Sequence, residues 1–157
     1  MSLSQPEGED RKSPLHLPKL SQAVAVTGVA AEKDTIWRNG VFAADAWTRI
    51  SDDAPAVEGP LLVSKRRWIS DRDNLIARNA PLGIQLEPGE TIDDLASDLE
   101  RFALIALSFP KYSDGRAFST ARLLREKYGY RGELRAVGNV LNDQVAFMWR
   151  VGFDSLD

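Results

Sequence analysis

The chain has 157 residues, with 20 Lys and Arg against 23 Asp and Glu, which gives a net charge of −3. It contains no cysteine, and its one histidine is His16. Thiolate nucleophiles, disulfides, Cys-ligated zinc and Cys-held iron–sulfur clusters are therefore excluded within this chain. The mild acidity argues against non-specific nucleic-acid binding. A chain without cysteine fits a reducing compartment, so we expect a cytoplasmic protein.

Residues 1–33 form a predicted disordered leader, which precedes a single α/β domain at 34–157. Pro6, Pro14 and Pro18 interrupt the leader, and it shows no sustained hydrophobic period. Its longest apolar run, at 23–31, is too short to cross a bilayer, which takes about 20 residues. We therefore expect neither a signal peptide nor a contact with the membrane.

The domain begins with a predicted β-hairpin at 35–50. Asn39-Gly40 suits a type I′ turn, because both central residues of that turn need positive φ. Short strands are expected on either side, at Ile36–Arg38 and Val41–Ala43. A loop that contains Pro, Asp and Gly, at 52–60, then separates the hairpin from the rest of the domain.

From Leu61 onward, four short apolar runs alternate with four helical patterns. The runs are Leu61–Ser64, Leu82–Glu87, Ala103–Phe109 and Glu133–Gly138, and helical spacing follows them at 68–79, 92–102, 117–128 and 141–151. This alternation predicts parallel βα units with right-handed crossovers over residues 61–157. Four such units form an open sheet or half of a barrel, and periodicity leaves both alternatives open. A half-barrel has two exposed edges, one of which the hairpin or a partner chain would have to cover.

Ligands of parallel α/β folds bind outside the carboxyl ends of the strands, which directs attention to the loops there. The loop after the third run holds Lys111, Tyr112, Ser113, Asp114 and Arg116 within six positions. Its two cations and the N–H groups of the following helix start could hold an anion, to which Ser113 could donate a hydrogen bond. The structural alternative is that Ser113 or Asp114 caps the helix while Arg116 pairs with a nearby acid.

The loop after the fourth run, at 137–144, brings further polar side chains to the same edge. Asn139 is a candidate for the anion-binding set, or else a helix cap. Asp143 and Asp114 form a candidate carboxylate pair for acid–base catalysis. Glu87, after the second run, could join them as a magnesium ligand, but no spacing rule supports that site, so we predict no metal and no cofactor.

Residues 109–156 resemble a bacterial domain-of-unknown-function family numbered nine-three-four. The segments DGRAFSTARLLREKYGYRGELRAVG and GFDSL carry the resemblance, which continues more loosely to the NG hairpin and the DAW segment at Asp45–Trp47. The resemblance implies a role in assimilatory sulfite reduction, because members carry that label from their neighbouring genes. Members tend to have an acidic residue where this chain has Asn139, and this difference favours the structural interpretation of Asn139.

The missing cysteines modify what the resemblance implies. This chain cannot itself ligate an iron–sulfur cluster or a sirohaem-linked thiolate, so we predict that it does not reduce sulfite. We expect an accessory protein that binds sulfite reductase, another sulfur-assimilation protein, or a small oxyanion. The alternatives are an enzyme that acts on a phosphorylated or sulfur-oxyanion substrate by acid–base chemistry, or a non-covalent flavin or nicotinamide oxidoreductase. A homodimer is also possible, anchored by tryptophans: Trp37, Trp47, Trp68 and Trp149.

Overall fold

The computed structural model describes residues 35–157, and the predicted leader at 1–33 lies outside this range. The strands are β1 (Thr35–Arg38), β2 (Val41–Ala44), β3 (Thr48–Arg49), β4 (Leu61–Ser64), β5 (Leu82–Leu86), β6 (Phe102–Phe109), β7 (Glu133–Gly138) and β8 (Ser155–Leu156). The helices are α2 (Lys65–Ala77), α3 (Arg116–Glu126) and α4 (Val145–Val151), with 3₁₀ turns η2 (Asp93–Leu95), η3 (Leu99–Arg101) and η4 (Asn142–Gln144). The predicted α/β class is confirmed.

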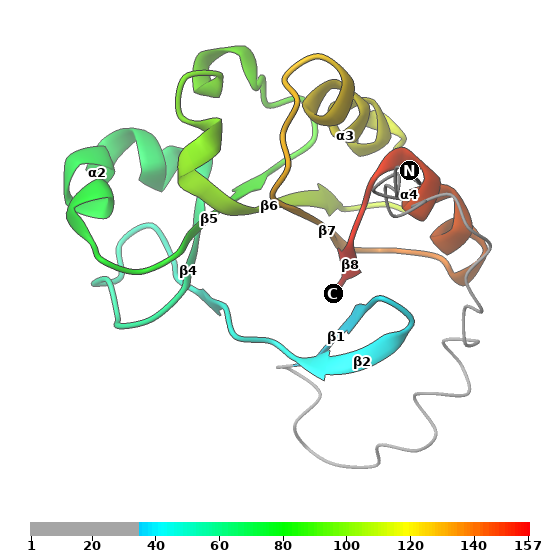
Figure 1. Cartoon of the computed structure of the whole chain (residues 1–157), viewed down its shortest axis with the longest axis horizontal. Coiled ribbons are helices and arrows are strands. Elements are labelled where there is room, and N and C mark those ends of the chain that lie inside the picture. The colour runs from blue at the N-terminus through cyan, green and yellow to red at the C-terminus, as the bar shows by residue number, and fades with distance from the viewer. Residues whose placement is uncertain (1–34) are drawn as a thin grey trace, which may run out of the picture.

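All eight strands belong to one sheet, in the order β2-β1-β8-β7-β6-β5-β4-β3. Strands β3 to β8 run parallel, whereas β1 pairs antiparallel with both β2 and β8. The sheet is curled and its three helices lie on the outer side, as Figure 1 shows, so the fold is a half-barrel. The hairpin covers the edge beside β8, which is one of the two solutions that the sequence leaves open.

The periodic strands and the turn lie where the sequence predicts them. The four apolar runs correspond to β4, β5, β6 and β7, and the hairpin turn has φ of 52° at Asn39 and 86° at Gly40. The two-residue strands β3 and β8 were not predicted, because two residues carry no periodic signal. They extend the parallel part of the sheet from four strands to six.

The second predicted helix, at 92–102, is wrong, so only three of the four βα units contain an α-helix. The N–H of Leu95 donates to the carbonyl of Ile92 (3.0 Å), and the N–H of Asp98 donates to that of Leu95 (2.8 Å), which is the 3₁₀ pattern. Apolar residues spaced by three suit 3₁₀ turns as well as an α-helix. The Asp98 carboxylate is buried here and accepts hydrogen bonds from Arg72 (2.6 Å) and Arg101 (3.3 Å), which lower its pKa despite burial.

The first helix, α2, begins earlier than predicted, and two basic residues of its first turn form hydrogen bonds within the domain. Ser64 is the N-cap of α2, and its hydroxyl accepts from the N–H of Arg67 (3.0 Å). Lys65 is buried and donates to the carbonyl of Thr91 (2.6 Å). The Arg67 guanidinium binds the carbonyls of the 52–60 loop and the carboxylate of Asp71. Lys65 and Arg67 are therefore buried and bonded within the domain, whereas Arg66 is exposed.

Both faces of the curled sheet are packed. The convex face and the helices enclose the larger core, which includes Trp37 and Trp68, so these two tryptophans cannot anchor a dimer. The concave face holds a smaller cluster of Leu62, Leu104, Ala106 and Val137 beneath the partly buried Trp47. Between residues 35 and 157, no helix has the length and apolar character needed to cross a bilayer.

The two edge strands of the sheet, β2 and β3, are neighbours along the chain. Only Asp45–Trp47 separates them, so this three-residue segment spans the opening between the edges. The Trp47 N–H donates to the Asp45 carboxylate (3.1 Å). An ion pair between Arg49 and Asp157 (3.2 Å), at the end of β8, also links the two sides of the opening.

A buried ion network fixes the Asp45–Trp47 segment inside the half-barrel. The Arg135 side chain is fully buried and donates to Asp45 Oδ2 (2.9 Å), Glu133 Oε1 (3.3 Å) and the Ser155 hydroxyl (3.3 Å). Arg38 approaches Glu133 from β1 with two hydrogen bonds of 2.8 and 2.9 Å. Two cations and two carboxylates therefore join β1, the segment after β2, β7 and β8.

We predict that Arg135→Met destabilises the fold by about 3–5 kcal/mol, because two carboxylates lose a buried partner while the volume of the side chain is largely kept. Urea unfolding at pH 7 measures the effect. The matched control is Arg122→Met, which breaks an exposed ion pair with Glu126 and should cost less than about 1 kcal/mol. Equal losses in the two variants would contradict a structural role for the buried network.

Candidate functional site

The loops after β6 and β7 converge at the carboxyl ends of these strands, as the sequence predicts. Asn139 Nδ2 donates to the carbonyl of Pro110 (2.6 Å), and its N–H donates to that of Phe109 (2.7 Å). Gln144 Nε2 donates to the carbonyl of Tyr112 (3.1 Å). Gly138 permits this approach, since a Cβ there would lie 2.6 Å from the Phe109 oxygen.

The loop between β6 and α3 is a turn fixed at several points. Besides the bonds from Asn139 and Gln144, the N–H of Asp114 donates to the carbonyl of Lys111 (3.0 Å). Asn139, which the sequence offers as a member of the anion site, instead holds the backbone of this loop in place. Its amide nitrogen is occupied by Pro110, and it does not cap the last helix.

Asp114 and Arg116 pair with each other at the start of α3. The Arg116 N–H donates to Asp114 Oδ1 (3.1 Å), and its guanidinium binds the same carboxylate with contacts of 2.7 to 3.3 Å. These hydrogen bonds lower the pKa of Asp114 to about 2. The carboxylate is therefore ionised at neutral pH and has no proton to donate. An external anion at this helix start would have to displace it.

The side chains at the tip of the same turn project into solvent, and Lys111 acts on Asp114 only through its charge, which helps to lower the pKa of that carboxyl. Lys111, Tyr112 and Ser113 are all exposed, and within residues 35–157 none of their side chains forms a hydrogen bond or an ion pair. Tyr112 is 59% exposed, in contrast to the half-buried tyrosine that is the usual case. The turn therefore has a fixed backbone and freely displayed side chains.

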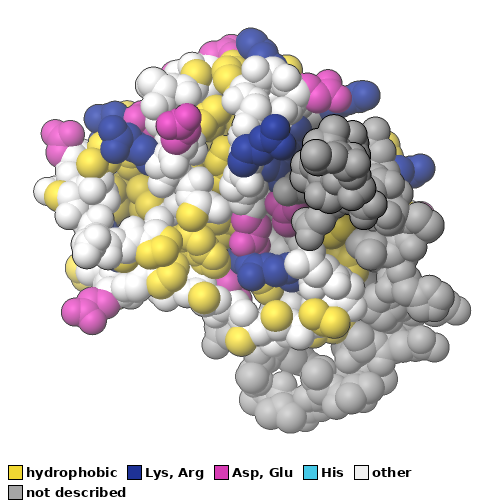
Figure 2. Space-filling model, viewed as in Figure 1, with side chains coloured by type: hydrophobic (Ala, Val, Ile, Leu, Met, Phe, Trp, Pro, Cys, Tyr) yellow, Lys and Arg dark blue, Asp and Glu magenta, His cyan; other side chains and the backbone are white. Residues whose placement is uncertain are grey.

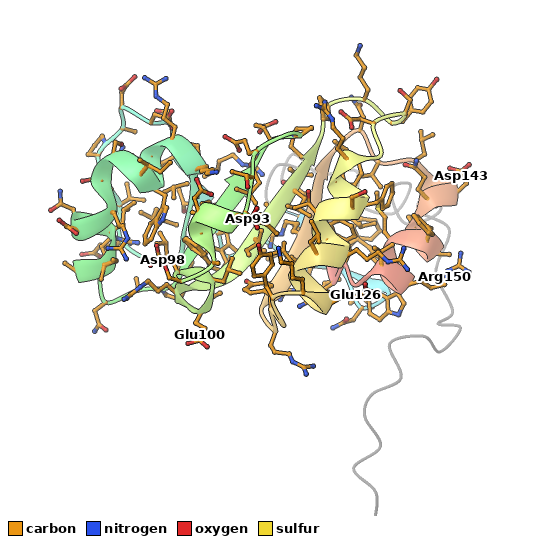
Figure 3. All side chains as sticks on the ribbon, turned by 90° about the horizontal axis from the view of Figure 1, so that it is seen from above. Asp93, Asp98, Glu100, Glu126, Asp143 and Arg150 are labelled. Carbon is orange, nitrogen blue, oxygen red and sulfur yellow. The ribbon has the colours of Figure 1, made fainter. Side chains whose placement is uncertain are left out.

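Asp143 and Glu87 do not complete a catalytic or metal-binding set. Asp143 lies exposed in η4, at the outer side of the molecule in Figure 3, and pairs with no described side chain. Glu87 accepts a hydrogen bond from Gln85 (3.0 Å). Across the described chain, no three Asp, Glu or His side chains are arranged to hold a metal ion, so Glu87, Asp114 and Asp143 do not form the magnesium set considered above.

Exposed apolar side chains continue from the turn along α4. Leu141 is 41% exposed and Phe147 is 47% exposed. Gln144 joins this region to the turn, because its side chain contacts both the Tyr112 carbonyl and the Leu141 N–H (3.3 Å). We call the exposed side chains here the loop–α4 face: Lys111, Tyr112, Leu141, Asp143, Phe147 and Arg150.

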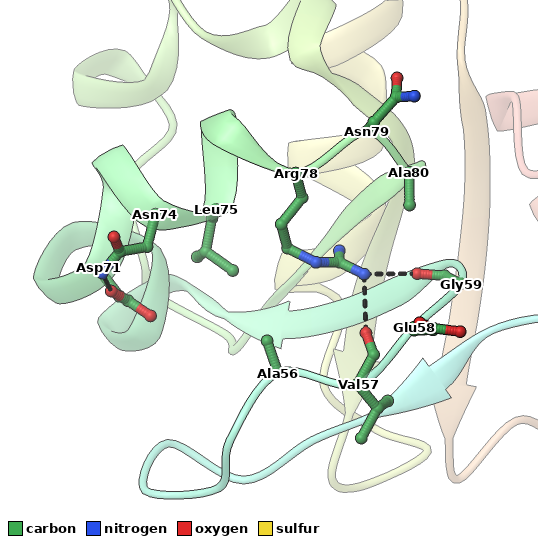
Figure 4. Close-up of a pocket in the computed structure, with 10 residues that line it drawn as sticks. All are labelled: Ala56, Val57, Glu58, Gly59, Asp71, Asn74, Leu75, Arg78, Asn79 and Ala80. Carbon is green, nitrogen blue, oxygen red and sulfur yellow. Dashed lines mark hydrogen bonds between the residues drawn. The ribbon is translucent and has the colours of Figure 1, made fainter.

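A hollow outside this face lies beside α2. A cavity of about 530 Å³ opens between the 56–59 segment, α2 and residues 78–80 (Figure 4). Arg78 Nη2 crosses it to the carbonyls of Val57 (2.8 Å) and Gly59 (2.7 Å). The Asp71 carboxylate is occupied by Asn74 (2.6 Å) and Arg67 (3.0 Å), which lower its pKa. Arg78, Asn74 and Asp71 therefore hold a loop in place, and Glu58 is the one charged side chain of the lining without a hydrogen bond or ion pair among the described residues.

Sequence reasoning missed the clamp made by Gln144 and the exposure of Leu141 and Phe147. The helical spacing places Leu141 with the buried Val145 and Met148, whereas it precedes the helix and faces solvent. Phe147 packs its ring on Phe118 (4.9 Å between centroids) and still leaves half its surface exposed. The one signal in the sequence is the position of Phe147 in α4, which lies outside the apolar stripe formed by Val145 and Met148.

We predict that Arg116→Gln raises the pKa of Asp114 from about 2 toward its ordinary value near 3.8, because the largest lowering contribution is lost. Carboxyl-carbon NMR across pH 1.5–6 measures the shift, and Arg122→Gln should leave it unchanged. The stabilisation from this pair is present above pH 4 and is lost as the pH falls through about 2. A midpoint for Asp114 near 3.8 in the wild type would contradict the pairing.

Comparison with known proteins gives one match. Residues 83–157, which contain β6 to β8, α3, α4 and all but the first residue of β5, match the family described as bacterial protein of unknown function (DUF934). No curated protein and no solved structure matches the chain. The matched segment includes the fixed turn, the Asp114–Arg116 pair, Arg135 and the loop–α4 face. By this match, the C-terminal part of the chain, which carries the candidate site, is similar to this family of bacterial proteins of unknown function.

Proposed function

We propose that the protein is a non-catalytic accessory component of assimilatory sulfur metabolism, which binds a protein of that pathway through the loop–α4 face. The pathway comes from the family resemblance described above. The binding role comes from the fixed turn, whose backbone is held by three hydrogen bonds while Lys111, Tyr112 and Ser113 project into solvent. A rigid loop loses little conformational entropy on binding, and exposed aromatic side chains are frequent interface anchors.

A protein partner fits this face better than a free oxyanion. The N–H of Arg116 and its guanidinium are both taken by Asp114, so two of the expected anion donors are already satisfied. The remaining surface is apolar in large part, since Tyr112, Leu141 and Phe147 are all more than 40% exposed. Apolar surface of this kind gains free energy when a protein covers it and gains nothing from a hydrated oxyanion.

The enzyme alternative has less support than binding in this region. Asp114 is ionised and paired, and Asp143 is solvated on the outer side of η4. The exposed hydroxyl of Ser113 has no base within hydrogen-bond distance among the described residues, which a nucleophile requires. Binding is therefore the role that these side chains support.

Affinity capture tests the proposal in a bacterium that encodes the protein, grown with sulfate as sole sulfur source. The tagged full-length chain should recover a sulfur-assimilation protein. The double variant Tyr112→Ser, Phe147→Ser should recover about tenfold less, because loss of one or two anchors costs at least 1.4 kcal/mol. The matched control is Ile69→Ser on α2, which removes an equally exposed apolar side chain (63%) outside the face.

Two outcomes would reject the proposal. The first is that wild-type protein recovers no sulfur-assimilation protein. The second is that Ile69→Ser reduces recovery as much as the double variant, since the face would then have no special role. Circular dichroism of each purified variant checks that the fold is retained, as expected for substitutions of exposed side chains.

A further inference from the structure

We infer that the partner surface bound by the loop–α4 face is acidic around an apolar centre. This inference rests on the proposed function, because it specifies the chemistry of the partner at the same face. It arises from an uneven distribution of charge that the overall net charge of −3 conceals.

The two halves of the domain differ in the sign of their charge. Residues 50–109 contain 6 Lys and Arg against 11 Asp and Glu, hence a net charge of −5. Residues 110–157 contain 8 Lys and Arg against 6 Asp and Glu, hence +2. Strands β3 to β8 are adjacent in chain order, so the two halves occupy opposite sides of the molecule, with α2 on one and α3 and α4 on the other (Figure 1).

Ion pairing within the described chain sharpens this difference. Between residues 50 and 109, six acidic side chains form no ion pair: Asp53, Glu58, Asp73, Glu87, Glu90 and Glu100. Between 110 and 157, three cations form none, namely Lys111, Arg131 and Arg150, against the single acid Asp143. Figure 2 shows charged side chains of both signs on one face, separated by apolar patches.

Two of the three unpaired cations border the apolar centre of the loop–α4 face. Lys111 adjoins Tyr112 on the turn. The Arg150 guanidinium lies 6.0 Å from the centroid of the Phe147 ring. Asp143 and Arg150 lie at opposite ends of the η4–α4 segment (Figure 3). An apolar centre with charged side chains at its rim is the usual composition of a protein interface.

The charges at the rim favour acidic groups on the partner. Exposed cations that form no ion pair within the domain gain Coulomb energy from an acidic surface and speed its approach. A second copy of this chain is a poorer occupant, because two molecules of net charge −3 repel each other. Contact between the basic half of one copy and the acidic half of the next would also be heterologous, and such contacts do not close into a dimer.

The test uses a labelled copolymer of glutamate and tyrosine as a probe, with anisotropy measured at low salt and at 0.5 M NaCl. Lys111→Gln with Arg150→Gln should weaken binding about five- to tenfold at low salt, and Asp143→Asn should strengthen it about two- to threefold. The matched control is Arg131→Gln, which removes an unpaired cation just before β7, at the opposite end of the strands from the turn, and should change nothing. High salt should abolish the differences.

Equal binding by all variants, or the same loss in Arg131→Gln as in the double variant, would overturn the inference. So would self-association in sedimentation that the double variant abolishes, because the occupant would then be a second copy. The capture experiment separates the two proposals. Recovery of a pathway protein that the double charge variant leaves unchanged rejects the acidic partner and retains the function. Absence of any pathway protein rejects the function, whereas copolymer binding still decides the inference.

Discussion

The charge of Arg135 is the constraint on which the geometry of the domain depends. A guanidinium that is fully buried needs carboxylates and further hydrogen-bond acceptors around it, since an unpaired charge in the interior is very costly. Glu133 comes from its own strand, but Asp45 comes from the segment that follows the hairpin. The chain between the two sheet edges must therefore pass across the opening of the curl. It carries Trp47 onto the concave cluster of apolar side chains.

The ion network and the loop–α4 face lie at opposite ends of the parallel strands. Glu133 and Ser155 are the first residues of β7 and β8, so the ion network lies toward the amino ends of the parallel strands. The fixed turn and Asn139 lie at the carboxyl ends of β6 and β7. In parallel α/β folds, side chains at the amino ends serve stability and loops at the carboxyl ends serve function. The loop–α4 face fits this division, because the side chains of its turn, Lys111 and Tyr112, form no hydrogen bond or ion pair among the described residues.

The sequence predicts what depends on local pattern and misses what depends on long-range pairing. Six strands, the Asn39-Gly40 turn and three of the four predicted helices follow from periodicity and turn chemistry. The 3₁₀ turns at 93–101 depend instead on Arg72 and Arg101, which hold the buried Asp98. The short strand β8 forms because β7 and β1 are both available to pair with it. No local pattern in Ser155–Leu156 indicates that environment.

Long-range pairing also decides the candidate site, because it determines which charged side chains remain free to bind a partner. Lys65, Arg67 and Arg116 are indistinguishable from Lys111 in a reading of residue types, since all four sit in loops or at helix starts after strands. In the fold, Lys65 and Arg67 are buried and Arg116 is held by Asp114, so the charges of these three side chains are already compensated. Lys111 differs because the backbone of its turn is fixed by groups outside it, and its side chain forms no hydrogen bond or ion pair among the described residues. A cation can serve a partner only if the fold does not use it, and that property belongs to the tertiary structure.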